Sequence, residues 1–198
     1  MINGVKYKQI NYRYFYLIVF VLCLYDFSRI CSSVPYIKMT LALLEEIGVS
    51  TSFNGNVISV NPLAKISEKT LVVESDWSSA SYFYSIASLV EVGSEISIAS
   101  YKATSLQGDS VLQEIYKQFG VETSFNKNVV KLKKVKEIPQ ETVINIDLAN
   151  APDIAQTIAV SCFGLGLKCE LSGLHTLKIK ETDRLEALKT ELTKLGAN

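Results

Sequence analysis

Apolar side chains recur at helical spacing in three segments of the sequence, and each segment ends at a glycine. The glycines are Gly48, Gly120 and Gly196. The apolar positions before them are Leu41, Leu44 and Ile47, then Leu112, Ile115 and Phe119, then Leu185, Leu188, Leu192 and Leu195. A spacing of three or four residues places them on one face of a helix, which glycine commonly closes. The pattern therefore predicts three amphipathic helices.

The sequence around these glycines is repeated. Residues 48–60 read GVSTSFNGNVISV, and residues 120–132 read GVETSFNKNVVKL. After each glycine the pattern predicts a β-hairpin, with Asn54-Gly55 and Asn126-Lys127 as the left-handed turn residues. A third copy begins before Gly196 and stops at Asn198, so the repeat predicts that the chain ends inside a module.

Short apolar runs between the copies predict further elements. We expect strands at residues 71–73, 95–99 and 143–146, and helices at residues 78–89 and 153–163. The lysine-rich run at residues 131–136 is expected to form a solvated strand face. Strands and helices that alternate within units of about seventy residues are typical of the α/β class.

Residues 14–25 form an unbroken apolar and aromatic run that differs from the rest of the chain. Lys6, Lys8 and Arg13 precede it, but no small-residue cleavage site follows. A membrane-spanning helix needs about 20 such residues, so we expect no membrane association. Three interpretations of residues 1–31 stay open: a buried core element, a damaged or chimeric start, and a targeting segment.

Composition narrows the classes of function. Apolar residues make up 48% of the chain, while Lys plus Arg and Asp plus Glu both number 20. This balance argues against binding of nucleic acid through bulk charge. A single histidine, His175, argues against a multi-histidine metal site. The four dispersed cysteines indicate a reducing, cytoplasmic compartment rather than a disulfide scaffold.

The most specific candidate chemistry lies directly before the third amphipathic helix, in Lys180-Glu181-Thr182-Asp183-Arg184. Thr182 is a plausible N-cap, and Asp183 suits the positive end of the helix dipole. The positive charges of Lys180 and Arg184 are unfavourable at this end of the dipole, unless an anionic ligand binds there. Glu181 is then a candidate general acid or base. The alternative is a solvated helix start with internal ion pairs.

The repeat relates this cluster to two earlier helix starts. Twelve residues before the three glycines lie Tyr36, Gly108 and Arg184, and fifteen before them lie Ser33, Ser105 and Glu181. If the modules pack around a common axis, the three starts form one surface that accepts anions. In the middle copy, we interpret Asp109 as an ordinary helix-start residue.

Asp153 stands at a further predicted helix start, after Asn150-Ala151-Pro152. It is either an N-cap or an exposed catalytic carboxylate. Residues 76–81 (DWSSAS) repeat this theme one module earlier. Because Ser and Asp are common at caps, the pattern leaves both interpretations open.

Several motifs together resemble one known family. They are DWSSASY at residues 76–82, SLQGD at 105–109, Pro152-Asp153 followed by Thr157, and KETDRL at 180–185, with SVPYI at 33–37 upstream. From about Ser32 to Asn198 the chain resembles the 5-enolpyruvylshikimate-3-phosphate synthase family. The resemblance implies an α/β fold of two lobes, each with three βαβαββ modules around a pseudo-threefold axis. Residues 32–68 would end one lobe and residues 69–198 would supply about two modules of the other, with residues 1–31 unmatched.

The resemblance also implies a reaction: transfer of the enolpyruvyl group of phosphoenolpyruvate to the 5-hydroxyl of shikimate 3-phosphate, with release of phosphate. Ser33 and Tyr36 would contact shikimate 3-phosphate. Asp153 would hold and deprotonate its hydroxyl, and Glu181 would protonate the methylene carbon of phosphoenolpyruvate. Lys180 would take part in catalysis and bind both substrates, and Arg184 would bind phosphoenolpyruvate. No metal or organic cofactor and no nucleic acid partner is implied, and the full-length family member is expected to be a cytoplasmic monomer.

The sequence departs from the family pattern at its start. The Ser-Ser-Gln phosphate-binding motif is absent from residues 9–16, and so are the amino-terminal Lys and Arg ligands. We therefore expect the 198-residue chain alone to be inactive. The alternatives are a non-catalytic fragment of this fold, the related UDP-N-acetylglucosamine enolpyruvyl transferase, and an envelope protein directed by its first thirty residues.

Overall fold

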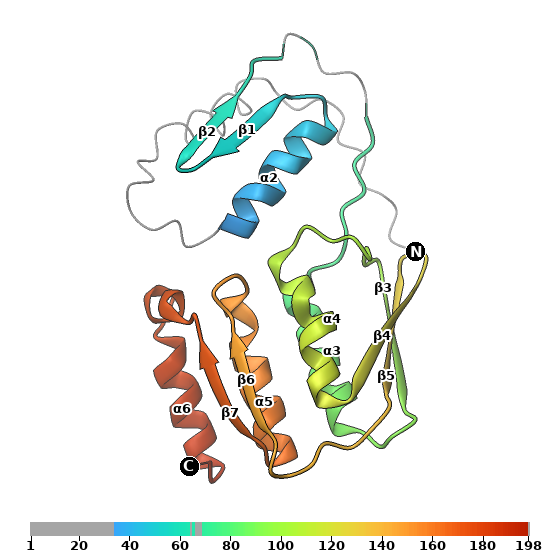
Figure 1. Ribbon diagram of the computed structural model, residues 1–198, viewed down its shortest axis with the longest axis vertical. Coiled ribbons are helices and arrows are strands. Elements are labelled where there is room, and N and C mark those ends of the chain that lie inside the picture. The colour runs from blue at the N-terminus through green and yellow to red at the C-terminus, as the bar shows by residue number, and fades with distance from the viewer. Residues whose placement is uncertain (1–33, 64, 66–68, 198) are drawn as a thin grey trace. The chain divides into compact units, whose positions relative to one another are not determined.

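The computed structural model describes residues 34–63, 65 and 69–197. The chain divides into two compact units between Val73 and Glu74 (Figure 1). Both contain helices and strands, which confirms the predicted α/β class. The interpretations of residues 1–31 fall outside the described residues. The lobe boundary after residue 68 stays a prediction.

The first unit is a helix packed on a hairpin. Helix α2 (Val34–Glu46) is followed by antiparallel strands β1 (Thr51–Asn54) and β2 (Val57–Val60). Its buried core consists of Leu41, Leu44 and Val49. Two of these lie on the predicted apolar face of the helix, so burial of that face against the hairpin holds this unit together.

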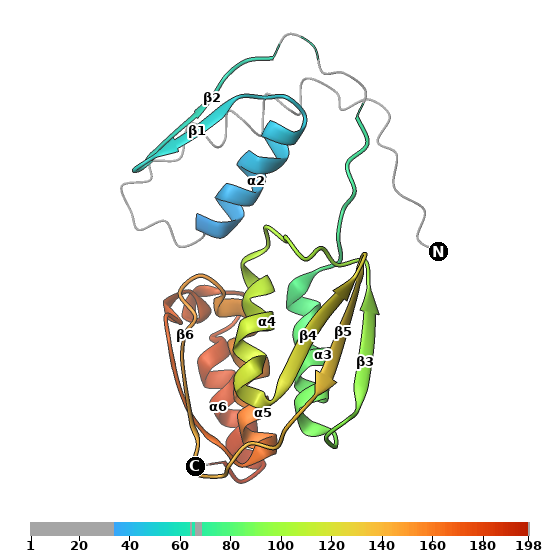
Figure 2. The same ribbon diagram turned by 45° about the vertical axis from the view of Figure 1, so that its right-hand side comes forward.

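The described part of the second unit contains two sheets with helices packed on them (Figure 2). The first sheet has antiparallel strands in the order β3-β5-β4: β3 (Glu95–Ala99), β4 (Val121–Asn126) and β5 (Val129–Lys134). The second pairs β6 (Val143–Asp147) in parallel with β7 (Lys168–Ser172). Parallel strands need a crossover, which α5 (Ala155–Leu165) supplies.

The other helical elements of this unit are α3 (Trp77–Leu89), η1 (Gly108–Val111), α4 (Leu112–Ile115), η2 (Tyr116–Phe119), η3 (Pro152–Ile154), η4 (His175–Ile179) and α6 (Arg184–Lys194). Helices α3, α4, α5 and α6 all begin at the same end of the unit (Figures 1 and 2). The positive ends of their dipoles therefore point the same way. None of the helices in the described segments combines the length and the apolar character needed to cross a membrane.

All three predicted glycine closures are confirmed. Gly48, Gly120 and Gly196 have φ angles of +94°, +73° and +97°, which L side chains rarely adopt. The segment before Gly120 is not one continuous helix, however, because η1, α4 and η2 follow one another there.

The hairpin turns lie one residue later than predicted. Asn54 and Asn126 are the last residues of their strands, paired with Val57 and Val129. The left-handed residues are Gly55 (φ +59°) and Lys127 (φ +55°), each at the first position of a two-residue loop. The alternating pattern marks the hairpin, but strand pairing decides where the turn begins.

The predicted strand at residues 71–73 is wrong, although the strands at 95–99 and 143–146 are confirmed. Val72 and Val73 are exposed. Just after them, the amide of Ser75 donates to the carbonyl of Ser100 at 2.6 Å. β3 takes β5 as its ladder partner.

The lysine-rich run does not form one solvated face. Lys131 and Lys133 are exposed and pair with Glu95 on the neighbouring strand, at 2.6 and 3.3 Å. Lys134 falls on the inner face of β5 and is fully buried. Its ammonium donates to the carbonyls of Ser88 and Phe119, at 2.7 and 3.1 Å. It thereby satisfies backbone acceptors near the ends of α3 and η2, which would otherwise lack partners.

Candidate active site

Asp183, not Thr182, caps helix α6. The Asp183 carboxylate accepts hydrogen bonds from the amides of Leu185 and Glu186, at 3.0 and 3.2 Å. The helix begins at Arg184, and an N-cap must directly precede the first helical residue. The predicted N-cap at Thr182 is therefore wrong by one position.

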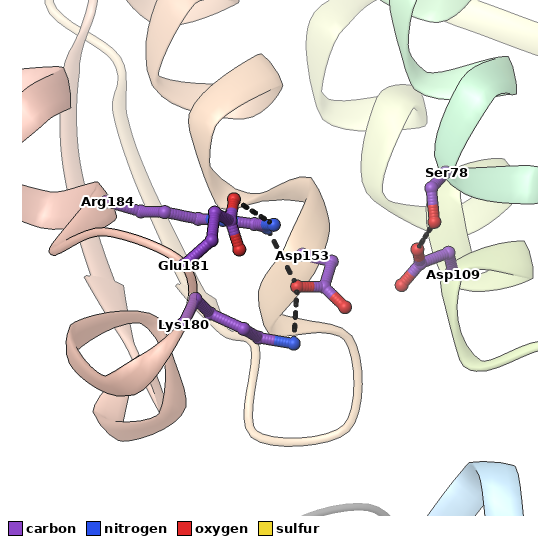
Figure 3. Close-up of polar contacts among 6 residues, drawn as sticks. All are labelled: Ser78, Asp109, Asp153, Lys180, Glu181 and Arg184. Atoms are coloured by element: carbon purple, nitrogen blue, oxygen red, sulfur yellow. Dashed lines mark hydrogen bonds and ion pairs between the residues drawn. The ribbon is translucent and has the colours of Figure 1, made fainter.

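Asp153 is not an N-cap either, because its carboxylate faces two cations (Figure 3). It lies in η3, and the residue that precedes α5 is Ile154, which makes no side-chain cap. The Oδ1 atom of Asp153 lies 3.2 Å from Nζ of Lys180 and 3.1 Å from Nη1 of Arg184. The three side chains are between 22% and 34% exposed, so their attraction is screened less than on an open surface.

Glu181 approaches the same cluster from its solvent side. Its Oε1 atom accepts from Nη2 and Nε of Arg184, at 2.8 and 2.9 Å. The Glu181 side chain is 66% exposed, against 22% for Arg184. A hydrogen bond from its own backbone, followed by the Arg184 guanidinium, holds the pKa of Glu181 below its ordinary value. Glu181 is therefore ionised at neutral pH in this arrangement.

A third carboxyl group, that of Asp109, interacts electrostatically with this cluster. Asp109 is 3% exposed and accepts a hydrogen bond from the Ser78 hydroxyl at the start of α3 (Figure 3). Burial raises the pKa of Asp109, and the carboxylates of Asp153 and Asp76 raise it further. The Ser78 hydrogen bond and the ammonium of Lys180 oppose this rise. Asp109 is thus within electrostatic reach of both Asp153 and Lys180.

Comparison with known proteins gives this cluster its context. Residues 25–198 match the model of the family described as EPSP synthase (3-phosphoshikimate 1-carboxyvinyltransferase). The chain belongs to this family. The resemblance carried by the motifs is therefore confirmed.

Relatives named 3-phosphoshikimate 1-carboxyvinyltransferase occur in distant organisms. The protein of Bacteroides fragilis is 41% identical over 163 residues, which cover 82% of this chain and 39% of the relative. That of Buchnera aphidicola is 37% identical, covering 83% and 37%. That of Methanocaldococcus jannaschii is 36% identical, covering 84% and 38%. The chain spans about two fifths of the length of these curated relatives.

Four of the site residues suggested by the EPSP synthase motifs lie together. Asp153, Lys180, Glu181 and Arg184 form one connected network, although Asp153 is 27 residues or more from the others in sequence. Tyr36 lies in α2, in the first compact unit. Ser33 falls outside the described residues. No group of three or more side chains suited to a metal ion occurs within residues 34–63, 65 and 69–197.

The residues of the SLQGD motif of the EPSP synthase family do not join this network but form contacts within the fold. The Gln107 side chain accepts from the Trp77 amide at 2.8 Å and donates to the Ser75 carbonyl at 3.0 Å. Ser105 donates to Glu74 at 2.6 Å. This motif thus fixes the start of α3. Sequence reasoning missed these contacts, because hydrogen bonds between residues about thirty positions apart leave no local pattern.

Proposed function

We propose that the protein carrying this chain transfers the enolpyruvyl group of phosphoenolpyruvate to the 5-hydroxyl of shikimate 3-phosphate and releases phosphate. The observation that carries the proposal is the network of Asp153, Lys180, Glu181 and Arg184. It combines two cations for anionic substrates with two carboxylates for proton transfer. Membership of the EPSP synthase family supports this assignment.

The first half of the reaction adds the hydroxyl across the double bond of phosphoenolpyruvate. Asp153 accepts the hydroxyl proton while the oxygen forms a bond to the carbon that bears the phosphate. Glu181 gives a proton to the methylene carbon, which becomes a methyl group. Lys180 and Arg184 hold the charged groups of the substrates, and Lys180 also steadies the Asp153 carboxylate.

The second half must regenerate the methylene group. The bond to phosphate breaks, Glu181 takes a proton back from the methyl group, and Asp153 returns its proton to the departing phosphate. Both carboxylates thus end in the state in which they began. Glu181 is ionised beside Arg184, so it needs a proton before it can act as an acid. Contact of Arg184 with the donor substrate loosens the Arg184–Glu181 pair and removes one cause of the lowered pKa.

The finer parts of the assignment belong to the same proposal. Ser33 and Tyr36 contact shikimate 3-phosphate, and the chain contributes βαβαββ modules to lobes with pseudo-threefold symmetry. The repeat of glycine-closed helices, with positive φ at Gly48, Gly120 and Gly196, supports such modules. The full-length protein is a cytoplasmic monomer that needs no metal or organic cofactor.

The test is release of phosphate from phosphoenolpyruvate in the presence of shikimate 3-phosphate. It is run on the 198-residue chain and on a completed protein, in which residues 25–198 replace the matching segment of the Bacteroides fragilis relative. We expect the completed protein to release phosphate only when both substrates are present. Asp153→Asn should abolish this rate.

Asp183→Asn is the matched control, because asparagine also caps helices. It removes a carboxylate from the same segment and should leave the rate unchanged. A completed protein that folds but releases no phosphate contradicts the proposed function and favours a non-catalytic role. Release that depends on UDP-N-acetylglucosamine instead of shikimate 3-phosphate reassigns the acceptor.

A further inference from the structure

Two pairs of buried hydroxyl groups join α3 to α5. In the first pair, Oγ of Ser81 lies 2.9 Å from Oγ1 of Thr157. Ser81 uses its single proton on the carbonyl of Ser78, at 2.6 Å, so Thr157 is the donor within the pair. In the second pair, Oγ of Ser161 lies 2.9 Å from Oγ of Ser85.

The two pairs define how the helices lie. Each pair joins residues 76 positions apart, and the second pair is one helical turn further along both helices. Helices α3 and α5 therefore run in the same direction, and their first turns lie side by side. Thr157 comes four residues, about one turn, after Asp153. Of the two pairs, the first is therefore the nearer to Asp153 along α5.

Other contacts between these helices are poorly suited to fixing this arrangement. Ala80, Ala155 and Ile158 are buried between α3 and its neighbours, but apolar contacts have little directional preference. A hydrogen bond between two buried hydroxyl groups is directional, and separating the groups leaves them unsatisfied.

We propose that Thr157 is a positioning residue for Asp153. This inference depends on the proposed function. The hydrogen bond from Thr157 to Ser81 fixes the height and rotation of the first turn of α5. It thereby holds Oδ1 of Asp153 between Lys180 and Arg184, where it lies 3.2 and 3.1 Å from their nitrogens. Thr157 itself does not contact substrate.

The second pair supplies a matched control. Ser161 is 0% exposed and Thr157 is 8% exposed, and the Ser161 hydroxyl also contacts the hydroxyl of Tyr116, at 2.8 Å, and the carbonyl of Thr157, at 2.9 Å. Loss of either pair removes a buried hydroxyl contact between the same two helices. A merely structural role predicts that kcat falls together with stability for both pairs, whereas a positioning role predicts that kcat falls only with loss of the first pair.

The experiment compares Thr157→Val and Ser81→Ala with Ser161→Ala in the completed protein. All three should lower Tm by about 2–6 °C, with Ser161→Ala at the upper end because its hydroxyl has the most contacts. Thr157→Val and Ser81→Ala should lower kcat about tenfold, because small misplacements of a reacting group are costly. The KM of phosphoenolpyruvate should stay within about twofold. Ser161→Ala should keep kcat, and Thr157→Ser, which retains the hydroxyl, should restore it.

A fall in kcat with Ser161→Ala equal to that with Thr157→Val overturns the inference. So does a failure of Thr157→Ser to restore the rate. If the parent protein is inactive, the proposed function fails instead, and urea unfolding of the 198-residue chain then decides. The inference requires that the midpoint shift of the double variant Thr157→Val/Asp153→Asn differs from the sum of the two single shifts. The shift of the double variant Ser161→Ala/Asp153→Asn should equal the sum of its single shifts. Additive shifts for both combinations contradict it.

Discussion

Arg184 at the start of α6 and Gly108 at the start of η1 stand at the same place in the repeat, twelve residues before a helix-closing glycine. Around Arg184, cations and carboxylates pair at the protein surface, and Glu181 remains 66% exposed. Around Gly108, the polar groups are turned inward, and Asp109 is 3% exposed. The same place in the repeat thus carries charged side chains at the surface in one copy and braces a neighbouring helix in the other.

The difference shows that polarity at a helix start does not by itself indicate chemistry. Ser105 and Gln107 direct their side chains to Glu74, Trp77 and Ser75 within the fold. Within the described residues, Lys180 and Arg184 pair with carboxylates, and one of these, on Glu181, is open to solvent. A substrate that bound Ser105 or Gln107 would have to replace bonds that hold the fold together.

The largest expected effect is a difference in kcat between variants of Glu181 and Ser105. These residues are equivalent in the repeat, fifteen residues before Gly196 and Gly120. In the completed protein, Glu181→Gln should lower kcat about 10²-fold or more, because the amide cannot transfer the proton. Ser105→Ala should leave kcat unchanged and lower only stability. Steady-state phosphate release measures both. Near-normal turnover of Glu181→Gln means that Glu181 is not the proton-transfer residue.

The next effect concerns binding of the donor substrate. Arg184→Ala should raise the KM of phosphoenolpyruvate about 10- to 100-fold, because a hydrogen bond to a charged group contributes about 1.5–3 kcal/mol. Arg184→Lys keeps the charge but loses the planar fork, so its KM should fall between the two. Equal KM values for Arg184→Ala and the parent protein place the donor elsewhere.

The elements of this structure were more predictable than the contacts between them. Glycine marks each helix end because its φ must be positive there, and that constraint is visible in one residue. Burial of Lys134 was not predictable, since it depends on which face of β5 lies inward. The same holds for the bond between Ser78 and Asp109, which are 31 residues apart.

In the candidate site, too, some features were visible in the local sequence and others depend on how the helices pack. The cations of Lys180 and Arg184 conflict with the helix dipole, and their local pattern left two interpretations, an anionic ligand or a solvated helix start with internal ion pairs. Asp153 had two equally good local interpretations, and only the resemblance to a family favoured the catalytic one. Its contact with Lys180 and Arg184 depends on how α5 and α6 pack, which no local pattern contains.

A smaller effect should show whether Gln107, at the start of α3, has a structural or a catalytic role. Gln107→Leu removes the hydrogen bonds with the Trp77 amide and the Ser75 carbonyl, at 2.8 and 3.0 Å. The free energy of unfolding should fall by about 1–3 kcal/mol, because two backbone groups lose their partners. Urea titration measures this loss. The kcat of the folded variant should not change, and a selective loss of kcat would assign Gln107 to the site.

The smallest effect should be a pH dependence of stability that originates at Asp109. Burial raises the pKa of Asp109 in the folded protein above its ordinary value of 3.8, and the nearby carboxylates of Asp153 and Asp76 add to this rise. Below pH 3.8, Asp109 is protonated in both the folded and the unfolded chain, so its contribution to stability is fully present. As pH rises toward the folded-state pKa, the unfolded chain releases this proton first, and stability falls.

Asp109→Asn removes this titration but keeps an oxygen that can accept the Ser78 hydroxyl. The variant should therefore gain stability relative to the parent chain as pH rises from below 3.8 to neutrality. Urea midpoints of both proteins across this range measure the difference. Midpoints that stay parallel show that Asp109 ionises equally in the folded and unfolded states. Burial would then have no effect on the ionisation of Asp109, in contrast to what its position beside Gly108 predicts.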